Sequence, residues 1–285
     1  MKKILTGLCL LPLLAYSQNF HFATRLGFAG YQGDLKQAKK ALTQLNLFGS
    51  LGAQYDLTEH ITARSYFSLT KVQGDDKRGN ASMQKRNLNF QSKLSDWELT
   101  AQYNLYSLND KWWTPYVFTG IGFFHFNPYT KDPAGNKAYL KPLSTEGEGF
   151  APGSPDYKLT QFCLPIGFGA TCTLGEDMRL GIEAGYRKTF TDYLDDVSRS
   201  YVDETSLSNA RGSEAVTLAY RGNEVGSGPY PKAGTLRGND RSKDGYYYIA
   251  ITFSIRYWFD KYKQIAGMPS MRKDKRVGCP ASRGF

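Results

Sequence analysis

The sequence contains no stretch of about 20 consecutive apolar residues, which is the length that a membrane-spanning helix requires. Beyond a short leader, its apolar residues fall into small groups separated by glycine and proline. The mature chain therefore either is soluble or crosses a membrane as strands. Its 20 tyrosines, 17 phenylalanines and 29 glycines suit an all-β chain in which aromatic residues mark the membrane interfaces.

The first residues predict export. Lys2 and Lys3 precede a mainly apolar run over residues 4–14, and Ala15-Tyr16-Ser17 forms a small-x-small cleavage site. We expect a signal peptide over residues 1–17 that is cleaved after Ser17. Cys9 follows a leucine rather than a small residue, so no lipid anchor is expected there.

Cysteine is too scarce for a disulfide framework. Cys163 and Cys172 fall on one predicted strand, nine positions apart, and therefore on opposite faces roughly 30 Å from each other. A disulfide needs Cα atoms within about 7 Å. Cys279 also has no internal mate, which leaves its thiol free to join a partner protein.

Period-two alternation is the main positive signal, because successive side chains of a strand point to opposite faces. In the first segment, for example, Phe22, Leu26 and Phe28 alternate with small or polar residues. Eight segments alternate in this way or are apolar on both faces, and they cover residues 20–29, 45–55, 61–70, 88–105, 113–127, 161–171, 179–187 and 248–257.

The fourth segment changes phase. Its apolar residues occupy even positions at Leu88, Phe90 and Leu94, and odd positions from Trp97 onward. A change near Ser95-Asp96 predicts either a β-bulge or a strand whose upper half leaves the membrane.

The connections between the segments alternate strictly in length. Short turns are predicted at residues 58–60, 107–111 and 175–177, and long loops at residues 32–43, 74–86, 128–156 and 191–245. Outer-membrane barrels have this pattern, with short periplasmic turns and long outer loops. We therefore predict an all-β fold over residues 18–259, namely an eight-stranded antiparallel transmembrane β-barrel, OmpA-like in size. Both termini would be periplasmic and the long loops extracellular.

Six charged residues are predicted to point into the barrel, whose eight strands leave room only for side chains. They are Arg25, Arg64, Glu98, Glu183, Arg187 and Arg256. Since an uncompensated buried ion costs several kcal/mol, these residues should form an ion-pair plug. A narrow or gated ion path lined by the arginines is the alternative.

Candidates for chemistry are few. His21, His60 and His125 are scattered, and no spacing of Ser, Asp and His supports catalysis. Asp192, Asp195 and Asp196 form an oxygen-rich cluster, but their spacing lacks the ligand ladder and glycine of a calcium loop. We expect a solvated loop base there, with a bound cation as the alternative. No catalytic residue, cofactor, metal or small-molecule substrate is predicted.

Basic residues concentrate after the last segment. Without Lys2 and Lys3 the chain has 34 Lys and Arg against 26 Asp and Glu, a net charge of +8. Residues 260–285 carry seven basic and two acidic residues, or +5 of that total. Export argues against nucleic acid, so this tail either binds an acidic partner or is a disordered, solvated end. The predicted partner-binding residues are Lys261, Lys263, Arg272, Lys273, Lys275, Arg276 and Cys279.

Five motifs resemble one family of Bacteroidetes outer-membrane barrels. They are GYQGDL at residues 30–35, RNLNF at 86–90, PYVFTGIG at 115–122 with FNP at 126–128, LSTEGEG at 143–149, and YRKTFTDYLDDVS at 186–198. This family includes PorG, the outer-membrane component of the type IX secretion system. The resemblance implies a non-enzymatic structural barrel, set in outer-membrane lipid, that associates with the periplasmic PorK–PorN ring. A stand-alone barrel that binds surface ligands or forms a narrow pore is the alternative.

Overall fold

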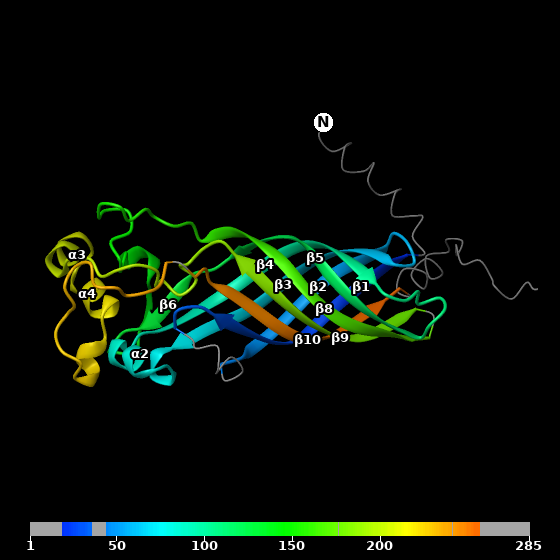
Figure 1. Cartoon of the computed structure of the whole chain (residues 1–285), viewed down its shortest axis with the longest axis horizontal. Coiled ribbons are helices and arrows are strands. Elements are labelled where there is room, and N and C mark those ends of the chain that lie inside the picture. The colour runs from blue at the N-terminus through cyan, green and yellow to red at the C-terminus, as the bar shows by residue number, and fades with distance from the viewer. Residues whose placement is uncertain (1–18, 36–43, 176, 241, 257–285) are drawn as a thin grey trace, which may run out of the picture.

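The computed structural model describes residues 19–35, 44–175, 177–240 and 242–256 (Figure 1). The predicted signal peptide, Tyr257 and the basic tail lie outside these residues. Eight long strands form the wall of a barrel, and they are β1 (Phe20–Gln32), β2 (Asn46–Asp56), β3 (Ile61–Asp75), β4 (Asn89–Asn104), β5 (Trp113–His125), β8 (Thr160–Leu174), β9 (Met178–Thr189) and β10 (Gly245–Ile255).

The sheet closes on itself. The pairing order is β3–β2–β1–β10–β9–β8–β5–β4, and β3 also pairs with β4. All pairs between neighbouring wall strands are antiparallel, including that between β1 and β10, the first and last strands of the wall. The predicted eight-stranded antiparallel barrel is confirmed.

The two faces of the wall differ in polarity as the alternation predicts. On β1, Leu26 is 67% exposed, whereas the neighbouring Arg25 is fully buried. Leu47 on β2 and Phe168 on β8 are exposed by 76% and 66% in the same way. The outward rows thus form an apolar belt around the barrel, and the inward rows meet in the lumen.

β4 contains no bulge. It pairs with β3 without interruption along its whole length, and its even-numbered residues Phe90, Leu94 and Glu98 are all buried inside. The phase does not change: the inward face becomes apolar towards the loop end of the strand, while the outward face there carries Lys93 and other polar residues. The bulge prediction is therefore wrong, and a strand that extends beyond the apolar belt fits these contacts.

Short turns and long connections lie at opposite ends of the barrel (Figure 1). The long connections contain short elements of their own, which are η3 (Asp76–Arg78), α2 (Ala81–Arg86), β6 (Pro128–Lys131), β7 (Lys137–Tyr139), η4 (Lys141–Leu143), α3 (Glu204–Arg211), α4 (Ser213–Ala219) and η5 (Gly222–Val225). In the part of the chain that the structure describes, no helix is both long and apolar enough to cross a membrane.

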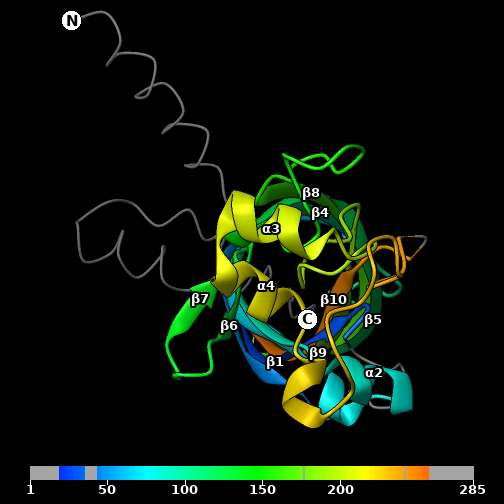
Figure 2. The same cartoon turned by 90° about the vertical axis from the view of Figure 1, so that its left-hand side faces the viewer.

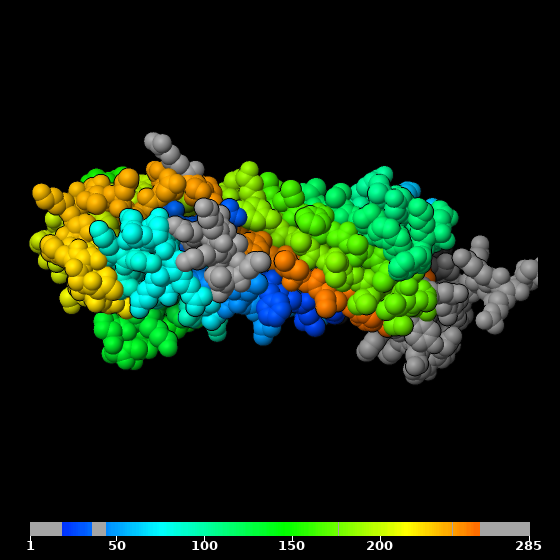
Figure 3. Space-filling model, turned by 60° about the horizontal axis from the view of Figure 1, so that its bottom comes forward, coloured from blue at the N-terminus to red at the C-terminus, as the bar shows by residue number. Residues whose placement is uncertain are grey.

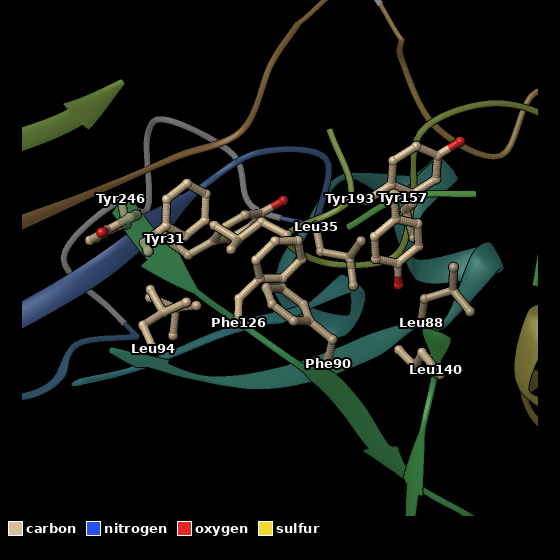
Figure 4. Packing of buried hydrophobic residues seen from close by; sticks show 14 of the residues in the cluster. Tyr31, Leu35, Leu88, Phe90, Leu94, Phe126, Leu140, Tyr157, Tyr193 and Tyr246 are labelled. Carbon is tan, nitrogen blue, oxygen red and sulfur yellow. The ribbon is translucent and has the colours of Figure 1, made fainter. Parts of the chain in front are cut away.

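Three of these connections, residues 76–88, 126–159 and 190–244, pack together into a body that we call the cap. Figure 2 shows α3 and α4 over one mouth of the barrel, and Figure 3 shows the cyan, yellow and orange cap segments packed together at that end. A buried apolar cluster joins Tyr31 and Phe90 of the barrel to Phe126, Leu140 and Tyr157 of the cap (Figure 4). Each such side chain contributes about 1.5–3 kcal/mol through its burial, so the cap is a folded part of the molecule.

Candidate functional site

Five of the six predicted interior charges meet in the middle of the lumen. Arg25 on β1 places Nη1 2.8 Å from Oε1 of Glu98 and 3.1 Å from Oε1 of Glu183. Arg64 on β3 reaches Oε2 of Glu183 at 2.7 Å, and Arg187 on β9 pairs with Glu98. All five side chains are at most 2% exposed. The ions come from four strands, and only the closed barrel brings them together.

The sixth charged residue of the cluster, and its third carboxylate, is Asp96, whose place in the lumen was not predicted from the sequence. Its Oδ2 lies 4.0 Å from Arg187 and accepts a hydrogen bond of 2.9 Å from Tyr246. With Asp96 the cluster holds three arginines and three carboxylates, so its formal charges balance. Asp96 is two positions from Glu98, so both side chains lie on the same face of β4. Assigning all even-numbered residues of this strand to the lumen would have identified Asp96.

Tyrosines complete the packing around the ions. Tyr116 donates to Oε2 of Glu183 at 2.8 Å, and Tyr248 donates to Oε1 of the same carboxylate. The guanidinium of Arg25 lies 3.8 Å from the centre of the Tyr66 ring. Gly52 makes room for that ring, since a Cβ there would come within 2.4 Å of it. Paired ions and aromatic rings thus fill this level of the lumen.

Arg256 does not join the cluster, and its placement there was wrong. It follows β10 at the short-turn end, where Nε lies 3.4 Å from Oδ1 of Asp177. Arg179 and Asp56 form a second pair at this end, at 2.6 Å. The inward phase of β10 was right, but Arg256 lies beyond the last residue of the strand, so it meets the turn instead of the lumen.

The histidines and the two described cysteines lie apart from the cluster. Nδ1 of His60 lies 2.8 Å from the carbonyl oxygen of Asn104, and Nδ1 of His125 lies 3.0 Å from Oγ1 of Thr160. His21 lies 3.8 Å from Asp56 at the short-turn end. Both thiols are free: Cys163 is buried under the cap, and Cys172 is half-buried on the other face of β8, as its spacing predicts.

The acidic cluster after β9 is buried, so the expectation of a solvated loop base was wrong. Asp192, Asp195 and Asp196 are 3%, 1% and 0% exposed. Asp196 accepts hydrogen bonds of 2.6 Å from the hydroxyls of Thr145 and Tyr157. Among the described residues, no three His, Cys, Asp or Glu side chains are arranged to hold a metal ion. These carboxylates therefore accept hydrogen bonds from the protein and are not arranged as ligands of a cation.

Arg237 ties the cap segments together. Its Nη1 lies 3.0 Å from Oε1 of Glu146 and donates to the carbonyl oxygen of Asp196 at 2.6 Å, while Nε donates to that of Ala219 at 3.1 Å. The guanidinium is almost fully buried. It therefore joins the segment before β8 to two points of the segment after β9.

The buried carboxyls make the cap sensitive to pH. Burial raises the pKa of Asp192 and Asp196 to about 6, and burial next to Asp196 and Glu146 raises that of Glu148 to about 8. These folded-state values exceed the usual carboxyl range near 4. Such groups stabilise the cap fully below their unfolded pKa, and this contribution is lost as the pH rises through the folded pKa.

We therefore expect cap amides to exchange hydrogen faster at about pH 9 than at about pH 5, after correction for the intrinsic rate, while barrel amides keep their protection. Glu148→Gln should weaken this dependence, because glutamine stays neutral throughout. Equal cap protection at both pH values would contradict the expectation.

Comparison with known proteins relates the chain to one family and to several barrels. Residues 2–213 match the family described as Domain of unknown function (DUF6089). No curated protein matches the sequence. Neisserial surface protein A is 9% identical, with 83% of this chain and 96% of that one covered and a TM-score of 0.40. OprG from Pseudomonas aeruginosa is 12% identical, with 84% and 94% covered and a TM-score of 0.38. The N-terminal barrel domain of OprF from the same species is 10% identical, with 84% and 98% covered and a TM-score of 0.36.

Proposed function

This chain belongs to the DUF6089 family, and we propose that it is a non-enzymatic outer-membrane barrel that serves as a structural component and not as a pore. The charge-balanced ion cluster in the lumen carries this proposal, because paired ions and rings occupy the level through which a solute would pass. The apolar belt supports the placement in a membrane, since strands that cross lipid turn apolar side chains outward.

The cap faces the outside of the cell in this proposal, and the short turns face the periplasm. Single cysteines introduced by Ala134→Cys or Ser227→Cys in the cap should react with an impermeant maleimide on intact cells. Asp110→Cys in the β4–β5 turn should not, since all three positions are exposed but only the cap would be outside. Cys172 and Cys279 are replaced beforehand, and lysed cells serve as the control. Labelling of the Asp110 position alone would show that the barrel has the opposite orientation, with the short turns outside the cell.

The assembly that the barrel would serve is the type IX secretion system, through the PorK–PorN ring that the sequence resemblance implies. The short turns offer little surface on the periplasmic side. The tail over residues 260–285, which lies outside the described residues, carries +5 and would dock on an acidic patch of a ring protein. A stand-alone barrel with a ligand-binding cap is the second candidate, and the folded cap favours it.

Truncation before Asp260 separates these candidates. The shortened barrel should still insert and remain heat-modifiable on gels, because every wall strand is kept. It should no longer recover ring proteins in a pull-down. Charge reversal at Arg272, Lys273, Lys275 and Arg276 should weaken recovery more at low salt than at high salt, because salt screens the attraction that the reversal removes. Reversal at Lys232 in the cap is the control. Full recovery by the truncated chain would remove the tail from the proposal.

A further inference from the structure

The cap carries a cavity of about 640 Å³ between α3, α4 and the segment around Pro229. The helices α3 and α4 that contribute to it lie at the end of the molecule opposite the short turns (Figure 1). Its volume falls within the range of about 300–1,000 Å³ that small-molecule sites occupy. None of the residues in the lumen cluster contributes to it.

The lining of this cavity is polar but almost uncharged. Of its eleven lining residues, Glu204 is the only acidic or basic one. Neutral amides and hydroxyls dominate the rest, and they include Ser208, Asn209, Ser213 and Thr217. A second cap cavity of about 380 Å³, beside Tyr157, has six charged residues among its thirteen. The low charge is therefore particular to the larger cavity and not a general property of the cap.

Two tyrosine rings add flat apolar surface to this lining. Tyr220 and Tyr230 line the cavity, with ring centres 6.0 Å apart, and Tyr201 packs edge-on against both. The contacts with Tyr201 hold the two rings in place. The hydroxyl of Tyr220 donates to the carbonyl oxygen of Gly228 at 3.4 Å.

The hydroxyl of Tyr230 has no hydrogen-bond partner among the described residues, although the atom is buried. A buried hydroxyl without a partner costs about 1–3 kcal/mol. Because this atom has almost no accessible surface, the cavity is lined by other atoms of Tyr230 and not by its hydroxyl.

We propose that this cavity binds a neutral saccharide. A pyranose ring presents C–H groups that pack on aromatic rings, and hydroxyls that both donate and accept hydrogen bonds. Tyrosine rings match the first property, and amide and hydroxyl side chains match the second. Glu204 can accept from sugar hydroxyls, and its charge disfavours sialylated or sulfated sugars.

Only the source of the sugar rests on the proposed orientation of the barrel. With the cap outside, the ligand is a glycan of the cell surface or its surroundings. Binding itself is measured on the solubilised protein, so its failure leaves the orientation untouched, and a reversed orientation leaves the binding untouched.

The test uses the full-length barrel in detergent on an array of neutral, sialylated and sulfated glycans, followed by saturation-transfer NMR with the methyl glycosides of the retained sugars. We expect retention of neutral glycans alone, with affinities of about millimolar for single sugars. Tyr230→Ala, which removes the ring, and Asn209→Ala should each weaken binding about three- to tenfold, whereas Tyr230→Phe should leave binding unchanged. Tyr230→Phe should leave the unfolding temperature unchanged or raised, because it removes an unpaired buried hydroxyl.

Tyr139→Ala is the control for Tyr230→Ala, since it removes a tyrosine ring on β7, away from the cavity, and should not alter binding. The proposal is overturned if no neutral glycan is retained and no saturation transfer appears at about 10 mM methyl glycoside. Retention of anionic glycans alone, or undiminished binding by both Tyr230→Ala and Asn209→Ala, would also overturn it.

Discussion

Replacing Glu183 by glutamine lowers the unfolding free energy of the barrel by about 3–5 kcal/mol, the range for removing one partner of a buried ion pair. Glu183 forms ion pairs with Arg25 and Arg64, accepts hydrogen bonds from two tyrosine hydroxyls, and is 2% exposed. Its loss leaves three arginines with two carboxylates in a space closed to water. The shift from folded to unfolded mobility on gels, followed against temperature or urea, measures the effect.

Removing both partners should cost less than removing one. The double variant Arg64→Met/Glu183→Gln keeps the charges balanced, so it should be more stable than Glu183→Gln alone. Glu224→Gln, which breaks a partly exposed pair with Arg221 in the cap, should cost at most about 1 kcal/mol.

The same cluster predicts that the barrel does not conduct ions freely. Wild-type barrel in a planar bilayer should show no large steady current, because the ions and rings close the lumen at this level. A large, stable conductance would show that the lumen is open and would favour the narrow-pore alternative. Equal stability of the single and double variants would show that the ions are not coupled.

Phe126→Ala should unfold the cap while the barrel stays intact, with a loss of about 3–5 kcal/mol in cap stability. Phe126 is fully buried, and its ring stacks with Phe124 at 5.5 Å and with Tyr157 at 6.2 Å. Truncation therefore leaves a cavity where the barrel and cap meet (Figure 4). Limited proteolysis should cleave residues 190–244 of the variant, and the wall strands should remain heat-modifiable.

Leu236→Ala is the control for this prediction. Leu236 is 80% exposed on the cap, so its truncation should change stability by no more than about 0.5 kcal/mol. If Phe126→Ala resists protease as well as the wild type does, the cap is held by its ion pairs, of which Arg237–Glu146 is the most buried, and not by the apolar cluster.

Sequence reasoning identified the strands because strand polarity is a local property. Each inward residue is separated from the next by one outward residue, so Leu26 and Arg25 reveal their faces without knowledge of their partners. The alternation of turn lengths then determined the order of the strands and the end at which the long loops gather. These two patterns also identified Arg25, Arg64, Glu98, Glu183 and Arg187 as inward residues.

Sequence reasoning failed where a residue's surroundings change along a strand or come from distant segments. Asp96 was missed because the apolar side chains of the inner face near it pack against the cap, which reversed the apparent phase of β4. Arg256 was misplaced because the pattern does not show where β10 ends.

The sequence by itself therefore determined the barrel, its two faces and most of its inward charges, because these follow from the pleat and from chain order. Only the tertiary structure decided which ions pair, that Asp192, Asp195 and Asp196 are buried, and that the long loops form a cap with a cavity of its own. Those features depend on contacts between residues far apart in the chain, such as Arg237 with Glu146, and such contacts exist only after the strands have closed and brought the loops to one mouth.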